Sequence, residues 1–364
     1  MKKILPILFF IFCGNNLHAQ NVNFDWVAHF GEIYWEKGLS TTVDASGNVY
    51  SSGYFNGVID FDPGPGVFTL SSINNTQGFL TKFDASRNFI WAKKIDGMDV
   101  HPSSIKINAS GDLMILGTYG AVIDLDPGPA IVNGATTDNL FLIKLNAAGD
   151  FVWGKTFVST VVFNKPFNLA LDPLGNAYIT GTFGNGADFD PGPGIYTMPL
   201  VGGEDIFILK LDVSGNFVWA KSIGSQSTFD EGNAIAVDGA GNVYITGTFG
   251  MACDFDPGPG IFSIDPDYWS AYVLKLNTFG DFVWAKYMKT DNFGSDGYSI
   301  KVDQSGNVYL GGTFDGLVDF DPGPGVYILQ SNGNVDGFIC KLDISGNFIW
   351  AKNVGAHPND FIND

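Results

Sequence analysis

The chain has 364 residues, of which 45% are hydrophobic, and its formal net charge is −19 at pH 7. This length and apolar content suffice for a large buried core. A negative field of this size repels phosphate and excludes nucleic acid as a partner, whereas cation binding or simple solubility fits the acidic balance.

The N-terminal segment has the pattern of a cleaved secretory signal. Residues 1–20, MKKILPILFFIFCGNNLHAQ, carry two lysines, then an apolar run from Ile4 to Cys13, then a polar stretch that closes on the small Ala19. The run is too short to span a bilayer, and no later segment is long and apolar enough to do so. We therefore expect an exported, soluble protein without a membrane span, secreted or held at the cell surface. Its mature form has a charge of −21, because cleavage removes two lysines and no acid.

An acidic heptapeptide recurs through the rest of the chain. DFDPGPG begins at Asp60, Asp188, Asp254 and Asp319, and a diverged copy, DLDPGPA, begins at Asp124. The copies start 64 to 66 residues apart. Self-similarity at a fixed period indicates a repeat architecture, in which each unit buries its faces against its neighbours.

Each repeat contains four short segments rich in β-branched and aromatic residues and bounded by Gly, Asn, Asp or Ser, which is typical of strands joined by tight turns. In the first repeat they are STTVD at 40–44, NVYSSGYF at 48–55, FLTKFD at 79–84 and NFIWAK at 88–93. Repeated four-stranded units are typical of a β-propeller, whose radial repetition protects the sheet edges. We therefore predict an all-β fold, a β-propeller of four-stranded blades spanning about residues 35–95, 98–158, 165–224, 231–290 and 296–355.

The two ends of the chain contain parts of a further repeat. NFDWVAHFG at 23–31 is similar to the last strand of a blade, and residues 356–364 are similar to the first. In a closed ring the two fragments would share a sixth blade, but that blade would lack its two middle strands. We therefore expect that the sequence is cut within a longer protein.

These repeats resemble a known family. The pairing of D-x-x-G-N-x-Y-x-x-G-T-F with K-L-D-x-x-G-N-F-x-W-A-K resembles the β-propeller repeats of secreted bacterial proteins, known as SBBP repeats, over nearly all of residues 23–364. The DFDPGPG segment is similar to a variant found in large surface or secreted proteins of gliding-type bacteria. The resemblance implies a propeller fold and export. It implies no particular activity, since the family members are mostly uncharacterised.

The heptapeptide falls in an insertion between the second and third strands of each blade. The residue before a proline is kept out of the helical region, so Asp62 is expected to be extended. Asp-Pro-Gly-Pro suits a β-turn with Pro63 at the second position and Gly64 at the third, in the left-handed region. The sequence thus predicts a small hairpin on every blade, with all five hairpins on one face of the disc.

The aspartates of the five hairpins are candidate metal ligands. Two carboxylates beside turn carbonyls and water supply the hard oxygens that Ca²⁺ prefers. The alternative is structural, with the first aspartate paired to a repeat lysine and the second bonded to backbone amides of its own turn. The candidate calcium ligands are Asp60, Asp62, Asp124, Asp126, Asp188, Asp190, Asp254, Asp256, Asp319 and Asp321.

Tryptophans divide into a periodic and an aperiodic group. One indole recurs on the fourth strand of every repeat and is expected to wedge between neighbouring sheets. The periodic residues are Trp91, Trp153, Trp219, Trp284 and Trp350. Trp35 and Trp269 break the period, and we regard them as ligand-binding candidates.

The first strand of each blade is expected to line the central channel, and there the copies differ. The equivalent positions are Thr42, Lys106, Ala170, Ala236 and Lys301. Two lysines in an acidic molecule make Lys106 and Lys301 candidates for ligand binding, although a solvated channel is the simpler interpretation.

These features favour a non-enzymatic module for binding, adhesion or structure. We expect a monomer that takes a protein or glycan ligand at the cell surface and has no cofactor other than Ca²⁺. No catalytic residue is predicted, because the histidines lack metal-ligand spacing, G-x-S-x-G is absent and five equivalent carboxylate pairs suit a scaffold. The alternative is a polysaccharide-active lyase or glycosidase that uses the channel mouth with Lys106 or Lys301.

Overall fold

The computed structural model describes residues 36–136, 139–158, 168–226, 230–291 and 294–355. Within these ranges the protein consists of strands and connecting turns, and it contains no helix. One antiparallel sheet is built from each repeat, and a further two-stranded sheet lies within the fourth repeat.

The strands of each sheet lie side by side in chain order. The first sheet contains β1 (Glu36–Val43), β2 (Val49–Asp60), β3 (Thr69–Phe83) and β4 (Phe89–Ile95). The second contains β5 (His101–Ile107), β6 (Leu113–Tyr119), β7 (Asn139–Leu145) and β8 (Phe151–Val158). The third contains β9 (Asn168–Leu171), β10 (Ala177–Phe183), β11 (Asp205–Leu211) and β12 (Phe217–Ile223).

The last two repeats add short extra strands to this plan. The fourth sheet contains β13 (Glu231–Val237), β14 (Val243–Phe249), β17 (Ser270–Leu276) and β18 (Phe282–Tyr287), and its hairpin forms β15 (Cys253–Asp254) and β16 (Ser263–Ile264). The fifth contains β20 (Ser295–Val302), β21 (Val308–Asp319), β22 (Ile328–Leu342) and β23 (Phe348–Val354), and β19 (Lys289–Thr290) pairs with the end of β21.

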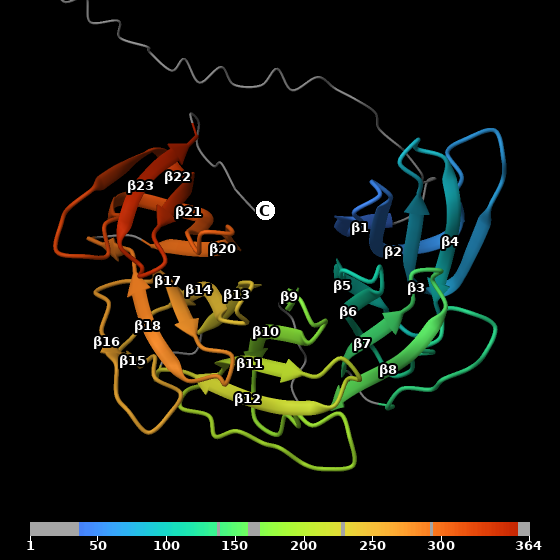
Figure 1. The fold of residues 1–364 in the computed structure, drawn as a ribbon, viewed down its shortest axis with the longest axis horizontal. Helices are drawn as coiled ribbons and strands as arrows, with labels where there is room; N and C mark the ends of the chain where they lie inside the picture. The colour runs from blue at the N-terminus through green and yellow to red at the C-terminus, as the bar shows by residue number, and fades with distance from the viewer. Residues whose placement is uncertain (1–35, 137–138, 159–167, 227–229, 292–293, 356–364) are drawn as a thin grey trace, which may run out of the picture.

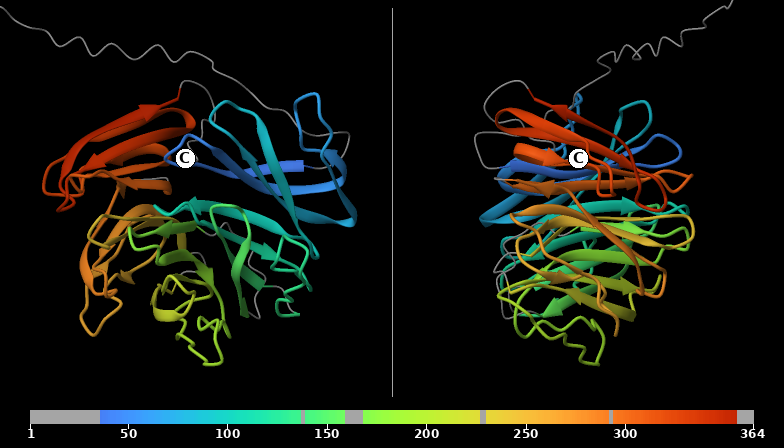
Figure 2. Two further views of the ribbon diagram at one scale, coloured as in Figure 1. Left: turned by 45° about the vertical axis from the view of Figure 1, so that its right-hand side comes forward. Right: turned by 90° about the vertical axis from the view of Figure 1, so that its left-hand side faces the viewer.

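The sheets are arranged radially, as blades (Figure 1). The first strand of every sheet, β1, β5, β9, β13 or β20, lies toward the centre, and the fourth strand lies at the perimeter. Side views show successive sheets fanned around the centre (Figure 2). Among the described residues, no strand pair and no hydrophobic cluster joins the fifth sheet to the first, so these two sheets form the ends of an arc. The prediction of an all-β fold of four-stranded units is confirmed, and ring closure stays a prediction.

An aspartate–asparagine pair builds the tight turn in the D-x-x-G-N signature. The Asp44 carboxylate accepts the backbone N–H groups of Ser46 and Asn48, both at 2.9 Å, and the Asn48 side chain donates to its other oxygen at 2.7 Å. Gly47 completes the turn with a φ of 83°, in the region that favours glycine. Turns that start with asparagine, such as Asn108, place an aspartate at the last position instead. The signature is therefore explained by local hydrogen bonding.

Neighbouring blades are held together by apolar clusters. We call the face of a sheet that meets the next sheet in chain order its back face, and the face that meets the previous sheet its front face. Tyr178 and Ile208 on the back of the third sheet share one cluster with Ile245 and Phe255 on the front of the fourth. Trp219 packs against this cluster and donates its indole N–H to the carbonyl of Thr278 in the next blade at 3.3 Å. The periodic tryptophan therefore joins adjacent sheets.

The repeated lysine of the third strand lies over a tyrosine ring of the second strand. Its Nζ is 4.7 to 5.0 Å from the ring centroid in the pairs Lys82–Tyr50, Lys210–Tyr178, Lys275–Tyr244 and Lys341–Tyr309. Such a cation–π contact stabilises a partly desolvated ammonium group. Met114 replaces the tyrosine in the second blade, and there Lys144 forms an ion pair with Asp112 at 3.0 Å. Lys341 also forms an ion pair, with Asp303 at 4.0 Å. The structural alternative predicted from the sequence paired a repeat lysine with the first aspartate of the heptapeptide, and it did not include the aromatic contact.

Candidate ligand-binding site

The heptapeptide is a corner that its own carboxylates hold together. In the first copy, Oδ1 of Asp60 accepts the amide N–H groups of Asp62 at 3.1 Å and Phe68 at 2.8 Å, which closes the loop across its base. Oδ1 of Asp62 accepts the N–H of Gly64 at 2.8 Å. The other four copies repeat these bonds with distances between 2.7 and 3.1 Å.

The glycines of the heptapeptide make room for the second aspartate. A Cβ at Gly66 would lie 2.3 Å from Oδ2 of Asp62, and the fifth residue, Gly64, is also close to this carboxylate. Gly64 is not among the residues with positive φ, so the predicted left-handed turn is wrong. The physical reason is that these glycines avoid a clash with the Asp62 side chain, a contact that turn propensities do not reveal.

The apolar residue of the heptapeptide anchors each hairpin in a hydrophobic cluster. Phe255 is fully buried, and its ring meets the ring of Phe249 at a centroid distance of 5.0 Å in an edge-on geometry. The equivalent residues of the other copies are also buried in the apolar clusters, namely Phe61, Leu125, Phe189 and Phe320. The repeated motif therefore has a structural role in every blade.

The ten aspartates proposed as calcium ligands lie in pairs within these corners, one pair per blade. Among the described residues, no group of three or more His, Cys, Asp or Glu side chains is arranged to hold a metal ion. A calcium site there would need backbone carbonyls and water to complete its ligand set. Calcium binding stays a prediction.

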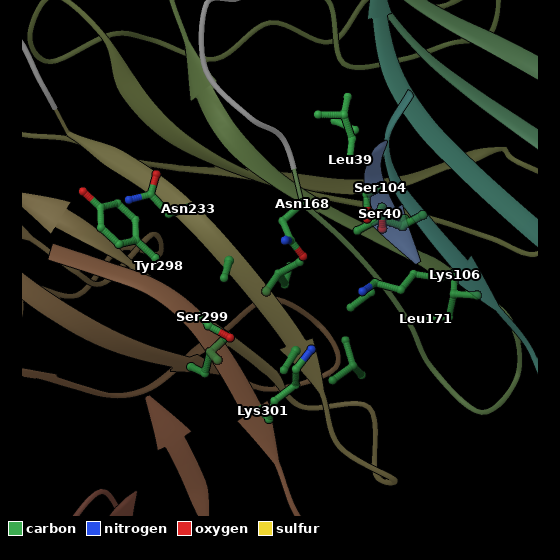
Figure 3. A pocket seen from close by; sticks show the side chains of 18 of the residues that line it. Leu39, Ser40, Ser104, Lys106, Asn168, Leu171, Asn233, Tyr298, Ser299 and Lys301 are labelled. Atoms are coloured by element: carbon green, nitrogen blue, oxygen red, sulfur yellow. The ribbon is translucent and has the colours of Figure 1, made fainter. Parts of the chain in front are cut away.

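A cavity of about 670 Å³ lies between the inner strands of all five sheets. This volume is within the range of small-molecule sites. Lys106 of β5 and Lys301 of β20 line it and project into the space from different sides (Figure 3). Thr42 of the equivalent set does not line it, whereas Ala170 and Ala236 do.

A β-bulge in the inner strands brings a second group of residues to the cavity. The register with the second strand shifts in β1, β5, β13 and β20, each time after a glycine or proline. The extra residue differs in every case and lines the cavity, as Leu39, Ser103, Asn233 or Tyr298. Bulges commonly re-aim a side chain toward a site. Sequence reasoning missed these residues, and the recurring Gly or Pro before them was the available signal.

Close packing against the previous blade requires glycine at two of these bulges. A Cβ at Gly232 would lie 2.5 Å from Oγ1 of Thr180, and one at Gly297 would lie 2.1 Å from Oγ1 of Thr246. The glycine therefore lets the inner strand approach its neighbour while the following residue, Asn233 or Tyr298, faces the cavity. The amide of Asn233 donates to the carbonyl of Gly297 at 3.1 Å, which links β13 to β20.

The charges around the cavity are unevenly placed along the inner strands. Lys106 and Lys301 lie toward the C-terminal ends of their strands, and Glu231 is at the N-terminal end of β13. Asp296, at the start of β20, does not line the cavity itself but lies two residues before Tyr298, which does, and it accepts a hydrogen bond from Thr248 at 2.8 Å. Burial, and to a smaller extent the charge of Glu231, raise the pKa of Asp296. One end of the cavity is therefore cationic and the other acidic.

Of the two aperiodic tryptophans, the one that the structure describes does not line this cavity. Trp269, just before β17, is 42% exposed, and its carbonyl accepts the N–H of Ser295 at 3.0 Å. It is absent from the residues that line the cavity. Trp35 lies outside the described residues.

Comparison with known proteins supports the repeat assignment. Residues 218–248 match the sequence model of the SBBP family, described as a beta-propeller repeat. This segment runs from β12 of the third sheet through β13 into β14 of the fourth, so it contains an outer strand, an inner strand and the turn signature.

Two other similarities concern longer stretches of the chain. An uncharacterised WD repeat-containing protein of Acanthamoeba polyphaga mimivirus is 22% identical over 411 aligned residues, which cover 91% of this chain and 29% of the viral protein. The crystal structure of the extracellular domain of a hybrid two-component system from B. thetaiotaomicron is 12% identical, with a TM-score of 0.21, over 92% of this chain and 53% of that chain. Among the described residues, the structure has no helix with the length and apolarity to cross a membrane.

Proposed function

We propose that the protein is a secreted or cell-surface β-propeller module that binds an acidic ligand, a glycan or a protein segment with carboxylates, in the cavity between its inner strands. The observation that carries this proposal is the placement of Lys106 and Lys301 in one cavity of an otherwise acidic chain. The module is a monomer and has no catalytic role in this proposal.

The chemistry of the cavity supports a ligand with both charged and hydroxylated parts. Two ammonium groups from different blades can bind a carboxylate from two sides. The amide of Asn233 and the ring of Tyr298 offer hydrogen bonds and an apolar face nearer the acidic end. Oligosaccharides of uronic acids combine these features, so they are the first probes.

Isothermal titration calorimetry with trigalacturonate tests the proposal. Lys106→Ala and Lys301→Ala should each weaken binding about tenfold or more, since a charge-assisted hydrogen bond is lost. Lys352→Ala, at an exposed lysine of the outer strand β23, is the matched control and should bind normally. Equal binding by the wild type and by the two cavity variants would contradict the proposal, as would binding of neutral oligosaccharides with the same affinity.

Export is a separate part of the proposal and is supported by the pattern of residues 1–20. Expression of the full chain in a bacterial host, followed by mass spectrometry of the N-terminus in the periplasmic or external fraction, tests it. Cleavage after Ala19 or Gln20 is the expected outcome, and a full-length cytoplasmic product would contradict it.

Calcium stabilisation of the hairpins is the third part. The support is the pairing of two carboxylates in each corner, five times over. If Ca²⁺ binds only the folded state, EDTA lowers the melting temperature and added CaCl₂ restores it. An unchanged melting temperature would leave the aspartates with only the amide contacts described above.

A glycan-active enzyme is the second candidate, and one observation favours it. Glu231 is the first residue of β13, and Asp296, at the equivalent position, is the second residue of β20. In β5 this position is occupied by His101. A single active site requires such a difference between blades, and the carboxyl group of Asp296, whose pKa is raised by burial, is suited to donate a proton. Release of reducing sugar or of unsaturated uronate from polygalacturonate, lost in Glu231→Gln, would support the enzyme. No turnover by the wild type, with binding retained, would favour the binding module.

A further inference from the structure

The four interfaces between consecutive blades follow one pattern of residues. The back face contributes one large residue from its second strand, one from its third, and one at or just after the end of its fourth. In the fourth sheet these are Tyr244, Val273 and Met288, all fully buried. The front face of the sheet that follows contributes a row of branched aliphatic residues. At the interface between the third and fourth sheets, this row is Ile235, Ile245 and Leu274. The interface is therefore directional, with a back face always meeting an aliphatic row.

The back face of the fifth sheet carries large apolar residues at the same three positions, but they are more exposed than in the other four sheets. Tyr309, Ile339 and Val354 occupy the three positions. Val354 is 48% exposed, whereas the equivalent Ile95, Phe157, Ile223 and Met288 are at most 4% exposed. Tyr309 and Ile339 are only half-buried, and their equivalents in the first four sheets are fully buried. This face therefore retains the composition of an interface.

The front face of the first sheet breaks the pattern in a different way. Its row is Thr41, Ser51 and Thr81, which are direct cross-strand partners. The other four rows are Ile105–Ile115–Ile143, Leu169–Ile179–Leu209, Ile235–Ile245–Leu274 and Ile300–Leu310–Cys340. The hydroxyls of Thr41 and Ser51 are 3.2 Å apart and bond to each other.

A row of hydroxyls is a poor partner for the exposed back face. Burial of hydroxyls against apolar groups is unfavourable unless they are hydrogen-bonded, and Oγ1 of the buried Thr81 already has no hydrogen-bond partner. Terminal units of a repeat array commonly carry a polar outer face, which prevents stacking of further copies. The first sheet has this property on its front face, and the fifth sheet lacks it on its back face.

We infer that the back face of the fifth sheet is a binding surface for one further repeat of this type, one with an aliphatic front row, and that the front face of the first sheet is not its partner. The occupant is identified by the four interfaces already present, all of which place an apolar row, branched aliphatic except for Cys340, against these same three positions. This inference concerns assembly of the array and does not depend on the ligand of the central cavity.

Extension of the full chain by one more repeat tests the inference. A copy of residues 295–355 is added after Asp364, and Val354→Cys is introduced at its original position as a reporter. Cys13 is replaced by serine in every variant. The two cysteines of the described residues, Cys253 and Cys340, are both buried, so the new thiol is the accessible one there. Its rate of maleimide labelling should fall at least tenfold in the extended chain relative to the unextended chain, because a docked blade allows labelling only after local opening.

The matched control is an extended chain whose added repeat carries Thr, Ser and Thr at the positions copied from Ile300, Leu310 and Cys340. This added repeat should leave the reporter accessible. Equal protection by both added repeats, or protection by neither while circular dichroism shows the added strands formed, would overturn the inference. If the aliphatic extension fails to gain strand signal, that result also counts against it, since the docking surface should template the new blade.

Sedimentation of the unextended protein separates this occupant from a second copy of the chain. The inference predicts a monomer across a hundredfold range of concentration, since a second copy offers only its own hydroxyl row or another back face. A concentration-dependent dimer that Val354→Asp dissociates would assign the surface to self-association and overturn the inference.

Discussion

The hairpins and the inner strands of this protein differ in what they repeat. In the hairpins, the same atoms make the same bonds in each of five blades, from the Asp254 carboxylate to the buried Phe255 ring. In the inner strands, the backbone bulge recurs while the residue it exposes changes from Leu39 to Ser103, Asn233 and Tyr298. Identical groups at equivalent positions serve an architecture common to all blades, whereas varied groups that converge on one cavity can serve a ligand.

Removal of a hairpin anchor should have the largest effect on stability. Phe255→Ala deletes a fully buried ring between the third and fourth blades and should lower the free energy of unfolding by about 3–5 kcal/mol, through lost burial and the resulting cavity. Urea denaturation followed by tryptophan fluorescence measures it. Ile261→Ala, in the same hairpin at a residue that is 83% exposed, should change stability by less than about 0.5 kcal/mol. Similar losses in both variants would contradict the anchoring role.

Removal of the cavity lysines should affect binding and leave stability nearly unchanged. Lys106→Ala combined with Lys301→Ala is expected to reduce the affinity for trigalacturonate by at least about a hundredfold, since each substitution removes a charged contact worth roughly 1.5–3 kcal/mol. The midpoint of urea unfolding should be close to that of the wild type. A large fall in stability with unchanged affinity would contradict this prediction, because it would show that the two lysines support the fold and not the ligand.

Loss of the corner carboxylate should have a smaller effect on stability than loss of the ring. Asp254→Ala removes the acceptor for the amides of Asp256 and Phe262 and should cost about 1–3 kcal/mol in unfolding free energy. Asp256→Ala removes the acceptor of Gly258 alone, at the exposed tip, and should cost less. Calorimetric melting of both variants with and without EDTA separates the hydrogen bonds from any contribution of calcium. If the two substitutions lower the melting temperature equally and EDTA abolishes both effects, metal binding is the main role of the corner and the amide hydrogen bonds are secondary.

The smallest effect concerns pH. Asp230 is buried, and burial raises its pKa, as does the charge of Asp205 to a smaller extent, although the amide and hydroxyl of Ser225 lower it. The folded state then holds its proton more tightly than the unfolded state, so stability falls as pH rises from the ordinary carboxyl pKa of 3.8 through the raised value. Asp230→Asn should flatten this decline toward pH 7. An unchanged pH profile would show that other groups cause the decline.

A second set of carboxylates opposes this trend at lower pH. Donation from the side chain and backbone amide of Asn307 lowers the pKa of Asp303, and the same contacts from Asn88 lower that of Asp84. These groups stabilise the fold above their ordinary pKa, and that contribution is lost as pH falls through their lowered values. Maximal stability is therefore expected at mildly acidic pH.

The sequence predicted the fold through its local signals. Alternating β-branched residues and the D-x-x-G-N turns fix strand ends and pairing within about 65 residues, so four strands per repeat could be read directly. The shape of the heptapeptide corner could not be predicted, because the glycine at position 66 is required by the nearby Asp62 side chain and not by a positive φ of its own. Nor were the contacts between four of the repeated lysines and the tyrosine directly opposite on the neighbouring strand predicted, because they depend on cross-strand register.

The cavity was predictable only in part. The position of Lys106 and Lys301 on the inner strand follows from alternation along that strand. The bulge shifts the register by one residue, and this shift decides that Asn233 and Tyr298 face the cavity. The hydroxyl row of the first sheet is visible in the sequence as Ser51 in place of isoleucine, but its meaning depends on cross-strand register with Thr41 and Thr81.

The most direct measurement of the central claim is calorimetric titration of trigalacturonate into three proteins: the wild type, the Lys106→Ala/Lys301→Ala double variant and the Asp62→Ala/Asp126→Ala double variant of the hairpins. Our account predicts that binding is lost from the lysine variant and retained by the hairpin variant. Binding that survives in the lysine variant and disappears from the hairpin variant would show that the repeated corners, and not the varied inner strands, form the site.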